Sequence, residues 1–175
     1  MLEVRKKEDG VVTVSLGLEE GLILKSLPDR LRKLLKDPDF SDRVIQRLFP
    51  IAYSDKLKEK EYRRLLGDDL VQRKLESVDL FDRSLTGAKV REEGVDVDIS
   101  PEEFEYWLGF VNDVRLMLGI ELDIRDDNWG VQFDPEHPRV DDLILLHFLS
   151  WLEEELLRAS DFEMPEIDPE DIPRG

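Results

Sequence analysis

The sequence predicts a mainly α-helical protein, a helical bundle of about five to six helices with a small β-hairpin at the N-terminus. Apolar residues recur at intervals of three and four along most of the chain, as they do on the buried face of a helix. The first 17 residues instead alternate apolar and polar side chains around a turn. Hydrophobic residues make up 41% of the chain, which is enough for a core although 38% of the residues are charged.

The N-terminal hairpin is predicted by valines and leucines that alternate with polar residues on both sides of Asp9-Gly10. Asp-Gly between alternating segments is a strong hairpin turn signal. Because a two-stranded ribbon is only marginally stable by itself, we expect its apolar side to cover the helices.

Two helices are expected next. Residues 18–36 carry leucines at helical spacing, and Pro28 either kinks this helix or starts a second one. A short helix then begins with Ser41 as its N-cap and ends near Phe49, because a residue before proline disfavours helical backbone.

A long charged helix is predicted over residues 57–86. In one interpretation Gly67 divides this helix, and Asp68 is then the N-cap of the second half. Gly87 is expected to end the helix. Its buried stripe consists of Val71, Leu75, Val78, Phe81 and Leu85. Alternation in residues 95–99 then suggests a short extended segment.

The clearest helix start follows at Ser100, with Pro101 at the first helical position and Glu103 completing a capping box. The stripe of this helix consists of Phe104, Trp107, Val111, Val114 and Leu118. Gly119 is its expected C-cap, although the next apolar residues can prolong the last turn.

A loop over residues 123–140 precedes the last helix, which we expect to be capped by Asp141 or Asp142 and to run to about Ala159. Apolar residues cover more than half of its circumference, so we expect it at the centre of the bundle. Residues 1–160 are therefore predicted to form one domain, and the acidic residues 161–175 a disordered tail.

The charge is unevenly distributed. Residues 1–74 hold 17 basic and 14 acidic residues, whereas residues 75–175 hold 8 basic and 28 acidic ones, which together give the net charge of −17. This balance disfavours binding to nucleic acid or to an anionic membrane. No cysteine is present, which excludes disulfides, thiolate metal sites and cysteine nucleophiles. Without a signal peptide or a long apolar run, we expect a cytoplasmic protein with no membrane segment.

No catalytic or metal site stands out. The acidic loop from Asp123 to Gly130 does not fit the calcium-loop pattern, and His137 and His147 lack metal-ligand spacing. There is no glycine-rich phosphate loop and no Gly-x-Ser-x-Gly motif. The sequence therefore predicts no catalytic residue, no metal and no cofactor.

Two polar clusters are candidate partner-binding sites. The long charged helix carries Arg63, Arg64, Arg73 and Lys74, which either pair with acids of later helices or hold an external carboxylate or phosphate. The Trp107 helix carries Asn112, Asp113 and Arg115, for which a structural role at the edge of the core is favoured over recognition.

Three blocks of sequence resemble an uncharacterised, mainly actinobacterial family, the domain-of-unknown-function family two-zero-one-seven. The blocks run from Glu61 to Leu75, from Trp107 to Gly119 and from Leu149 to Ala159, and the Asp9-Gly10 hairpin also fits. Leu66-Gly67 departs from the more usual residues before the aspartate pair. Within the blocks, the matched polar and aromatic residues are Arg63, Arg64, Asp68, Asp69, Arg73, Lys74, Asn112, Asp113, Arg115, Trp151 and Arg158. All of these except Trp151 and Arg158 are candidate partner-binding residues.

The resemblance implies a helical body with a small β element and no assigned activity. Members of the family are often encoded beside the adaptor that delivers substrates to the Clp protease, which implies a role near regulated proteolysis. Our leading hypothesis is a non-enzymatic interaction or regulatory module with a protein partner of unidentified nature. Two alternatives stay open: a carboxylate-rich metal-dependent hydrolase, and an acidic nucleic-acid mimic that binds a basic protein.

Overall fold

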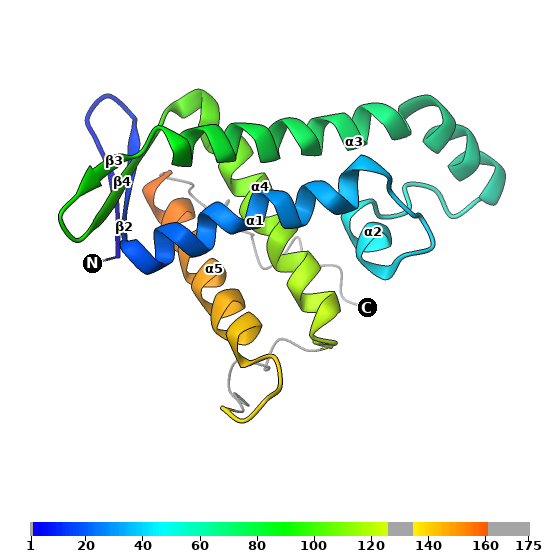
Figure 1. Ribbon diagram of the computed structural model, residues 1–175. Helices are drawn as coiled ribbons and strands as arrows, with labels where there is room; N and C mark the ends of the chain where they lie inside the picture. Colours follow the sequence, from blue (N-terminus) through cyan, green and yellow to red (C-terminus); the bar gives the residue numbers. More distant parts are fainter. Residues whose placement is uncertain (1, 126–134, 161–175) are drawn as a thin grey trace, which may run out of the picture.

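The computed structural model describes residues 2–125 and 135–160, which form a sheet at one end of the molecule with the helices extending from it (Figure 1). The elements are β1 (Glu3–Lys6), β2 (Val12–Gly17), α1 (Leu18–Lys36), α2 (Arg43–Leu48), α3 (Lys56–Thr86), β3 (Lys89–Arg91), β4 (Gly94–Ile99), α4 (Pro101–Glu121) and α5 (Val140–Ala159). The mainly helical class is confirmed. Residues 126–134 and the predicted tail, residues 161–175, lie outside the described residues.

The sheet has the order β1-β2-β4-β3, with antiparallel pairing throughout. The predicted hairpin is confirmed, and Gly10 occupies the left-handed region of its turn at φ 86°. The sheet is wider than predicted, because residues 94–99 pair with β2 and with a third strand, β3. Strand β3 was missed because its three residues are all exposed and show no apolar alternation.

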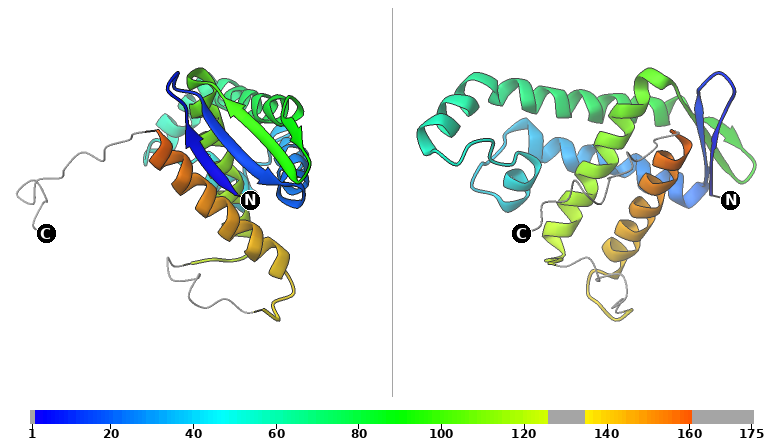
Figure 2. Two further views of the ribbon diagram at one scale, coloured as in Figure 1. Left: turned by 90° about the vertical axis from the view of Figure 1, so that its left-hand side faces the viewer. Right: turned by 180° about the vertical axis from the view of Figure 1, so that it is seen from behind.

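The two faces of the sheet differ sharply. Val12, Val14 and Leu16 of β2 are buried with Val97 and Ile99 of β4, on the face that α1, α3 and α5 cover. The left view of Figure 2 shows the strands in front of these helices. The expectation that the hairpin covers the helices is therefore confirmed, and the opposite face of the sheet is polar.

Helix α1 runs unbroken through Pro28, so the interpretation of two separate helices is wrong. Proline removes one backbone hydrogen bond and crowds the preceding turn. The buried side chains of Leu24, Leu27, Leu31 and Leu35 continue on both sides of Pro28, and their packing outweighs that loss.

Helix α2 starts one residue later than predicted. Its N-cap is Asp42, whose carboxylate accepts hydrogen bonds from the backbone N–H groups of Val44 (2.7 Å) and Ile45 (3.2 Å). Ser41 instead donates its hydroxyl to Asp39, at 2.6 Å. A carboxylate is the stronger acceptor at the positive end of a helix, which explains why Asp42 rather than Ser41 is the N-cap.

Helix α3 is continuous through Gly67, so the interpretation in which Asp68 caps a second half is wrong. Asp55 is the cap, and Gly87 follows the last turn as predicted. A single glycine in a helix costs about 1 kcal/mol, which the packing of the second half of α3 outweighs. Of the predicted stripe, Val78, Phe81 and Leu85 are buried and the two earlier members are half-buried.

Helix α4, rather than α5, is central. Its capping box at Ser100 is confirmed, and its buried residues include Trp107, Phe110, Val111, Val114, Met117 and Leu118. It packs against α2, α3 and α5, and Phe110 stacks on Phe81 with ring centroids 3.9 Å apart. The helix ends at Glu121 with Leu122 as C-cap, beyond the predicted Gly119.

The prediction of a central α5 is wrong. This helix contacts α4 and β1, and Ile144 on its other side is 53% exposed. The residue at its N-cap position is Arg139, whose side chain makes no cap hydrogen bond, while Asp141 and Asp142 lie within the first turn. The wide apolar face of α5 is therefore only partly covered.

Candidate functional site

The nine predicted partner-binding residues lie on α3 and α4, and four of them serve the fold. Lys74 and Asp113 form an ion pair between the two helices, with Lys74 Nζ 2.8 Å and 3.0 Å from the two carboxylate oxygens. The side chain of Asp113 is only 7% exposed and that of Lys74 is 24% exposed. Burial raises the pKa of Asp113, and the neighbouring ammonium group opposes that rise. This pair is an internal connection rather than an open site.

Arg115 connects α4 to α5. Its guanidinium group donates to the Ser150 hydroxyl at 3.2 Å and forms a close ion pair with Glu153. The Ser150 hydroxyl in turn donates to the Leu146 carbonyl at 2.8 Å. The structural role favoured for Arg115 from the sequence agrees with this geometry.

Arg63 holds the segment that follows α2. It donates to the Phe49 carbonyl at 2.8 Å, pairs with Glu59 at 3.0 Å and lies over the Phe40 ring at 4.9 Å. The second oxygen of the Glu59 carboxylate accepts from the backbone N–H groups of Ala52 and Tyr53, at 3.1 Å and 2.9 Å. Arg63 and Glu59 together fasten the loop before α3 to the helix.

The other five predicted residues are exposed: Arg64, Asp68, Asp69, Arg73 and Asn112. Arg64 pairs with Glu61 within one turn of α3, at 2.6 Å, and such an exposed pair contributes little stability. Asn112 lies on α4, and no hydrogen bond or ion pair among the described residues joins it to the predicted residues of α3. The structure thus divides the predicted site between a buried connection and an exposed surface of α3.

That exposed surface belongs to a projecting part of the molecule. The first turns of α3 and the preceding loop extend beyond the other helices (Figures 1 and 2). We call residues 51–66 the α3 projection. Its large exposed hydrophobic residues are Ile51 at 72%, Tyr53 at 47%, Leu57 at 79%, Leu65 at 61% and Leu66 at 42%.

The surface of the α3 projection has two shallow hollows, one on each side of Tyr53. The hollow towards Ile51 has a volume of about 500 Å³ and the hollow towards Leu65 and Leu66 about 510 Å³. Tyr53 lines both hollows and meets Tyr62 edge to face, with ring centroids 5.7 Å apart. Concave surface with exposed apolar side chains is typical of a protein-binding site.

The α3 projection is also locally basic. Residues 51–66 hold five basic and three acidic residues, a surplus of two positive charges on a chain whose net charge is −17. Two of the acids, Glu59 and Glu61, pair with Arg63 and Arg64. Within the described residues, no ion pair involves Lys56, Lys58 or Lys60. Lys56 and Lys58 flank Leu57 in sequence, and Lys60 follows it by three residues, about one helical turn.

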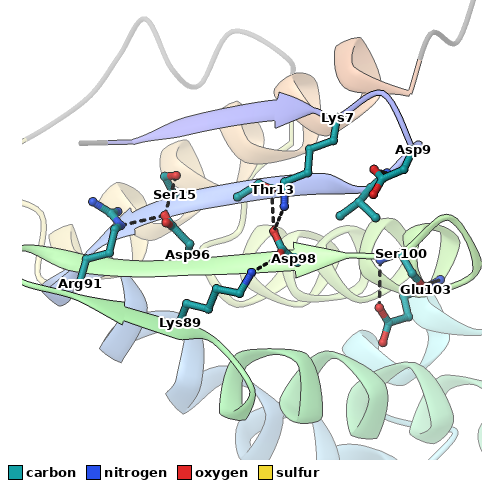
Figure 3. Close-up of polar contacts among 11 residues, drawn as sticks. Lys7, Asp9, Thr13, Ser15, Lys89, Arg91, Asp96, Asp98, Ser100 and Glu103 are labelled. Atoms are coloured by element: carbon teal, nitrogen blue, oxygen red, sulfur yellow. Dashed lines mark hydrogen bonds and ion pairs between the residues drawn. The ribbon is translucent and has the colours of Figure 1, made fainter.

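The polar face of the sheet carries a network of hydrogen bonds and ion pairs that the sequence analysis did not predict (Figure 3). The Asp98 carboxylate accepts from Lys7 at 2.8 Å, from the Thr13 hydroxyl at 2.6 Å and from Lys89 at 2.7 Å. These donors hold the pKa of Asp98 well below its ordinary value, with Lys7 and Lys89 contributing most. One carboxylate on β4 therefore connects β2, β3 and the turn after β1. The alternation of residues 95–99 already placed Asp96 and Asp98 on one face of a strand. Only the pairing of β4 with β2 shows that Asp98 lies beside Thr13 and Asp96 beside Ser15.

A second carboxylate on the same face repeats this arrangement. Asp96 accepts from the Ser15 hydroxyl at 2.7 Å and from Arg91 at 2.9 Å (Figure 3). Thr13 and Ser15 are 5% and 7% exposed, because the longer side chains cover them. Both carboxylates are occupied by internal donors, so this face is a structural network.

In the described parts of the chain, no group of three or more His, Cys, Asp or Glu residues is arranged to hold a metal ion. No helix over residues 2–125 and 135–160 is long and apolar enough to cross a membrane. His137 accepts a backbone hydrogen bond from Arg139 at its Nδ1 atom, at 3.0 Å.

Comparison with known proteins identifies a family but no activity. A family model described as Domain of unknown function (DUF2017) matches residues 1–160. No curated protein and no solved structure matches the chain. The family resemblance of the sequence blocks is thereby confirmed.

Proposed function

We propose that this chain, which belongs to the family Domain of unknown function (DUF2017), is a non-enzymatic interaction module. In this proposal it binds a protein partner through the α3 projection. The observation that carries the proposal is the exposure of five large hydrophobic side chains on residues 51–66. Contiguous exposed apolar surface on a folded domain is typical of an interaction site.

The chemistry of the α3 projection defines the partner. Leu57 is the most exposed of the five side chains, and Lys56, Lys58 and Lys60 are its neighbours in sequence. A complementary surface has an apolar centre with carboxylates around it. At physiological ionic strength charges act over about 8 Å, so the local surplus of positive charge governs the contact despite the acidity of the whole chain.

The exposed predicted residues of α3 extend this surface. Arg64 lies within the α3 projection, and Asp68, Asp69 and Arg73 continue along the same helix. We propose that they contribute to the rim of the contact, where charges act on partner choice more than on affinity. A regulatory role near Clp-dependent proteolysis is part of this proposal and rests on the family resemblance alone. The proposed cytoplasmic location rests on the sequence composition.

The test is affinity capture from native lysate with three forms of the tagged full chain. Leu57→Asp replaces the most exposed hydrophobic side chain of the α3 projection with a carboxylate. Leu22→Asp is the matched control, because Leu22 is 70% exposed on α1 and receives the same charge change. We expect one stoichiometric partner that the wild type and Leu22→Asp retain, and that Leu57→Asp binds at least about tenfold more weakly.

Two results would contradict the proposal. One is a partner that Leu57→Asp and Leu22→Asp bind as well as the wild type does, since the contact would then lie elsewhere. The other is the absence of any stoichiometric protein partner from lysate. Circular dichroism of both variants establishes that the substitutions leave the fold intact.

A further inference from the structure

A second apolar surface lies between the first turns of α1 and α5, far from the α3 projection in sequence. We call it the α1–α5 groove. It has a volume of about 600 Å³ and its apolar lining consists of Leu2, Ile23, Ile144, Leu145 and Phe148. Leu2, Ile23 and Ile144 are 37%, 43% and 53% exposed, so the groove is open to solvent. Its volume is within the range of sites that bury several side chains of a ligand.

The groove exists because α5 lies at the edge of the molecule. The apolar face of this helix is wider than its contact with α4 and β1. Leu149, Leu152 and Leu156 face the core, whereas Ile144 and Phe148 line the groove. Phe148 also stacks on Trp151, with ring centroids 6.1 Å apart, which holds its ring in place at the wall of the groove.

The rim of the groove is acidic. It consists of Glu19 and Glu20 in the first turn of α1, and Asp141 and Asp142 in the first turn of α5. Asp142 is occupied by Arg30 at 3.0 Å and Arg139 at 2.6 Å. The other three carboxylates make no ion pair with any residue that the structure describes.

Acids in the first turn of a helix also interact favourably with the helix dipole, whose positive end offsets part of their negative charge. The positive end of a helix is equivalent to about half an elementary charge, so the N-termini of α1 and α5 together offset about one of the three unpaired carboxylates. The rim therefore keeps a negative surplus of about two charges.

We infer that the α1–α5 groove is a binding site for a basic amphipathic helix of a partner protein. Apolar side chains one turn apart on that helix enter the groove, while Lys or Arg residues beside them meet the carboxylates of the rim. The site is separate from the α3 projection and of opposite charge, so this inference does not depend on the function proposed above.

The test uses the full chain and a designed, fluorescently labelled peptide of about five helical turns, with leucines on one face and lysines on the other. A second peptide keeps the leucines and replaces every lysine with glutamate. Fluorescence anisotropy at physiological salt measures both affinities. We expect the lysine peptide to bind at least about tenfold more tightly than the glutamate peptide.

Two pairs of variants locate the site. Ile23→Ser/Ile144→Ser removes apolar lining, and Leu22→Ser/Leu157→Ser is its control on exposed positions of the same two helices. Glu19→Lys/Asp141→Lys reverses the rim, and its control, Glu102→Lys/Glu105→Lys, makes the same charge change on exposed positions of α4. We expect each groove variant to weaken the lysine peptide by about tenfold or more, and each control by less than about threefold.

Three outcomes would overturn the inference: equal binding of both peptides, equal losses in groove and control variants, or no binding of the lysine peptide. Sedimentation velocity of the chain alone adds a fourth. Self-association that Ile23→Ser/Ile144→Ser abolishes would assign the groove to a second copy of this chain instead of a partner helix. None of these outcomes changes the result expected for Leu57→Asp, so the two proposals fail separately.

Discussion

The ion pair between Lys74 and Asp113 allows a sharp test of whether these residues hold the fold. The Asp113 side chain is buried, whereas that of Lys74 is partly exposed. Lys74→Met leaves a buried carboxylate without its partner, which should lower the free energy of unfolding by about 3–5 kcal/mol at neutral pH. Asp113→Asn leaves an ammonium group that can reach water, and its cost should be about 1–2 kcal/mol.

The pH dependence of Lys74→Met follows from the pKa of Asp113. Burial raises this pKa above its ordinary value in the wild type, and the ammonium group of Lys74 opposes the rise. Without Lys74 the pKa rises further, so the folded variant binds a proton at pH values where the unfolded chain has released it. Stability of the variant therefore increases, relative to the wild type, as the pH falls towards the ordinary aspartate pKa of about 4.

Urea unfolding followed by circular dichroism, at pH 7.5 and at about pH 5, measures both effects. The double variant Lys74→Met/Asp113→Leu should recover stability to within about 1 kcal/mol of the wild type, since neither charge is then buried. The reasoning is refuted if Asp113→Asn costs more than Lys74→Met. A deficit of Lys74→Met that stays constant between the two pH values would also refute it.

Two further predictions concern the sheet and the long helix. Three donors lower the pKa of Asp98, so the contribution of its carboxylate to the free energy of unfolding is present above about pH 4 and is lost on acidification. Between about pH 5 and pH 2.5 the wild type should therefore lose about 1–2 kcal/mol more stability than Asp98→Asn. Parallel acid-unfolding curves of the two proteins would count against this. In Gly94→Ala the new Cβ atom would lie 2.0 Å from the Leu16 carbonyl oxygen, which should cost about 2–4 kcal/mol in thermal or urea unfolding. Its control Gly67→Ala meets nothing within 4 Å and should gain about 0.5–1 kcal/mol, so destabilisation there would show that Gly67 serves another purpose.

Short-range signals predicted the helices well. The capping box at Ser100, the Asp9-Gly10 turn and the end of α3 at Gly87 depend on residues within a few positions of one another. The errors at Ser41 and Gly67 arose where two local signals competed, and the structure chose the stronger cap or the better-packed helix. Such competition is settled by fractions of a kcal/mol per residue that sequence patterns do not resolve.

The candidate site was harder to predict from the sequence than the helices were, because it depends on tertiary contacts. The sequence identified Lys74, Asp113 and Arg115 as informative residues, but their sequence positions do not show that Lys74 faces Asp113 across two helices. Exposure was predicted only in part, since Val71, Leu75 and Phe81 belong to one predicted stripe and, of these three, only Phe81 is fully buried. Burial depends on which elements meet, and no local pattern contains that information.

By itself, the sequence determined that this chain is acidic, mainly helical and able to form a hairpin, because composition, periodicity and turn chemistry act locally. Only the tertiary structure decided that β4 joins that hairpin in one sheet, that α4 occupies the centre and that α5 lies at the edge. The same apolar stripe can face a core, a groove or a partner. The packing of distant elements decides among these, and it left the α3 projection and the α1–α5 groove uncovered.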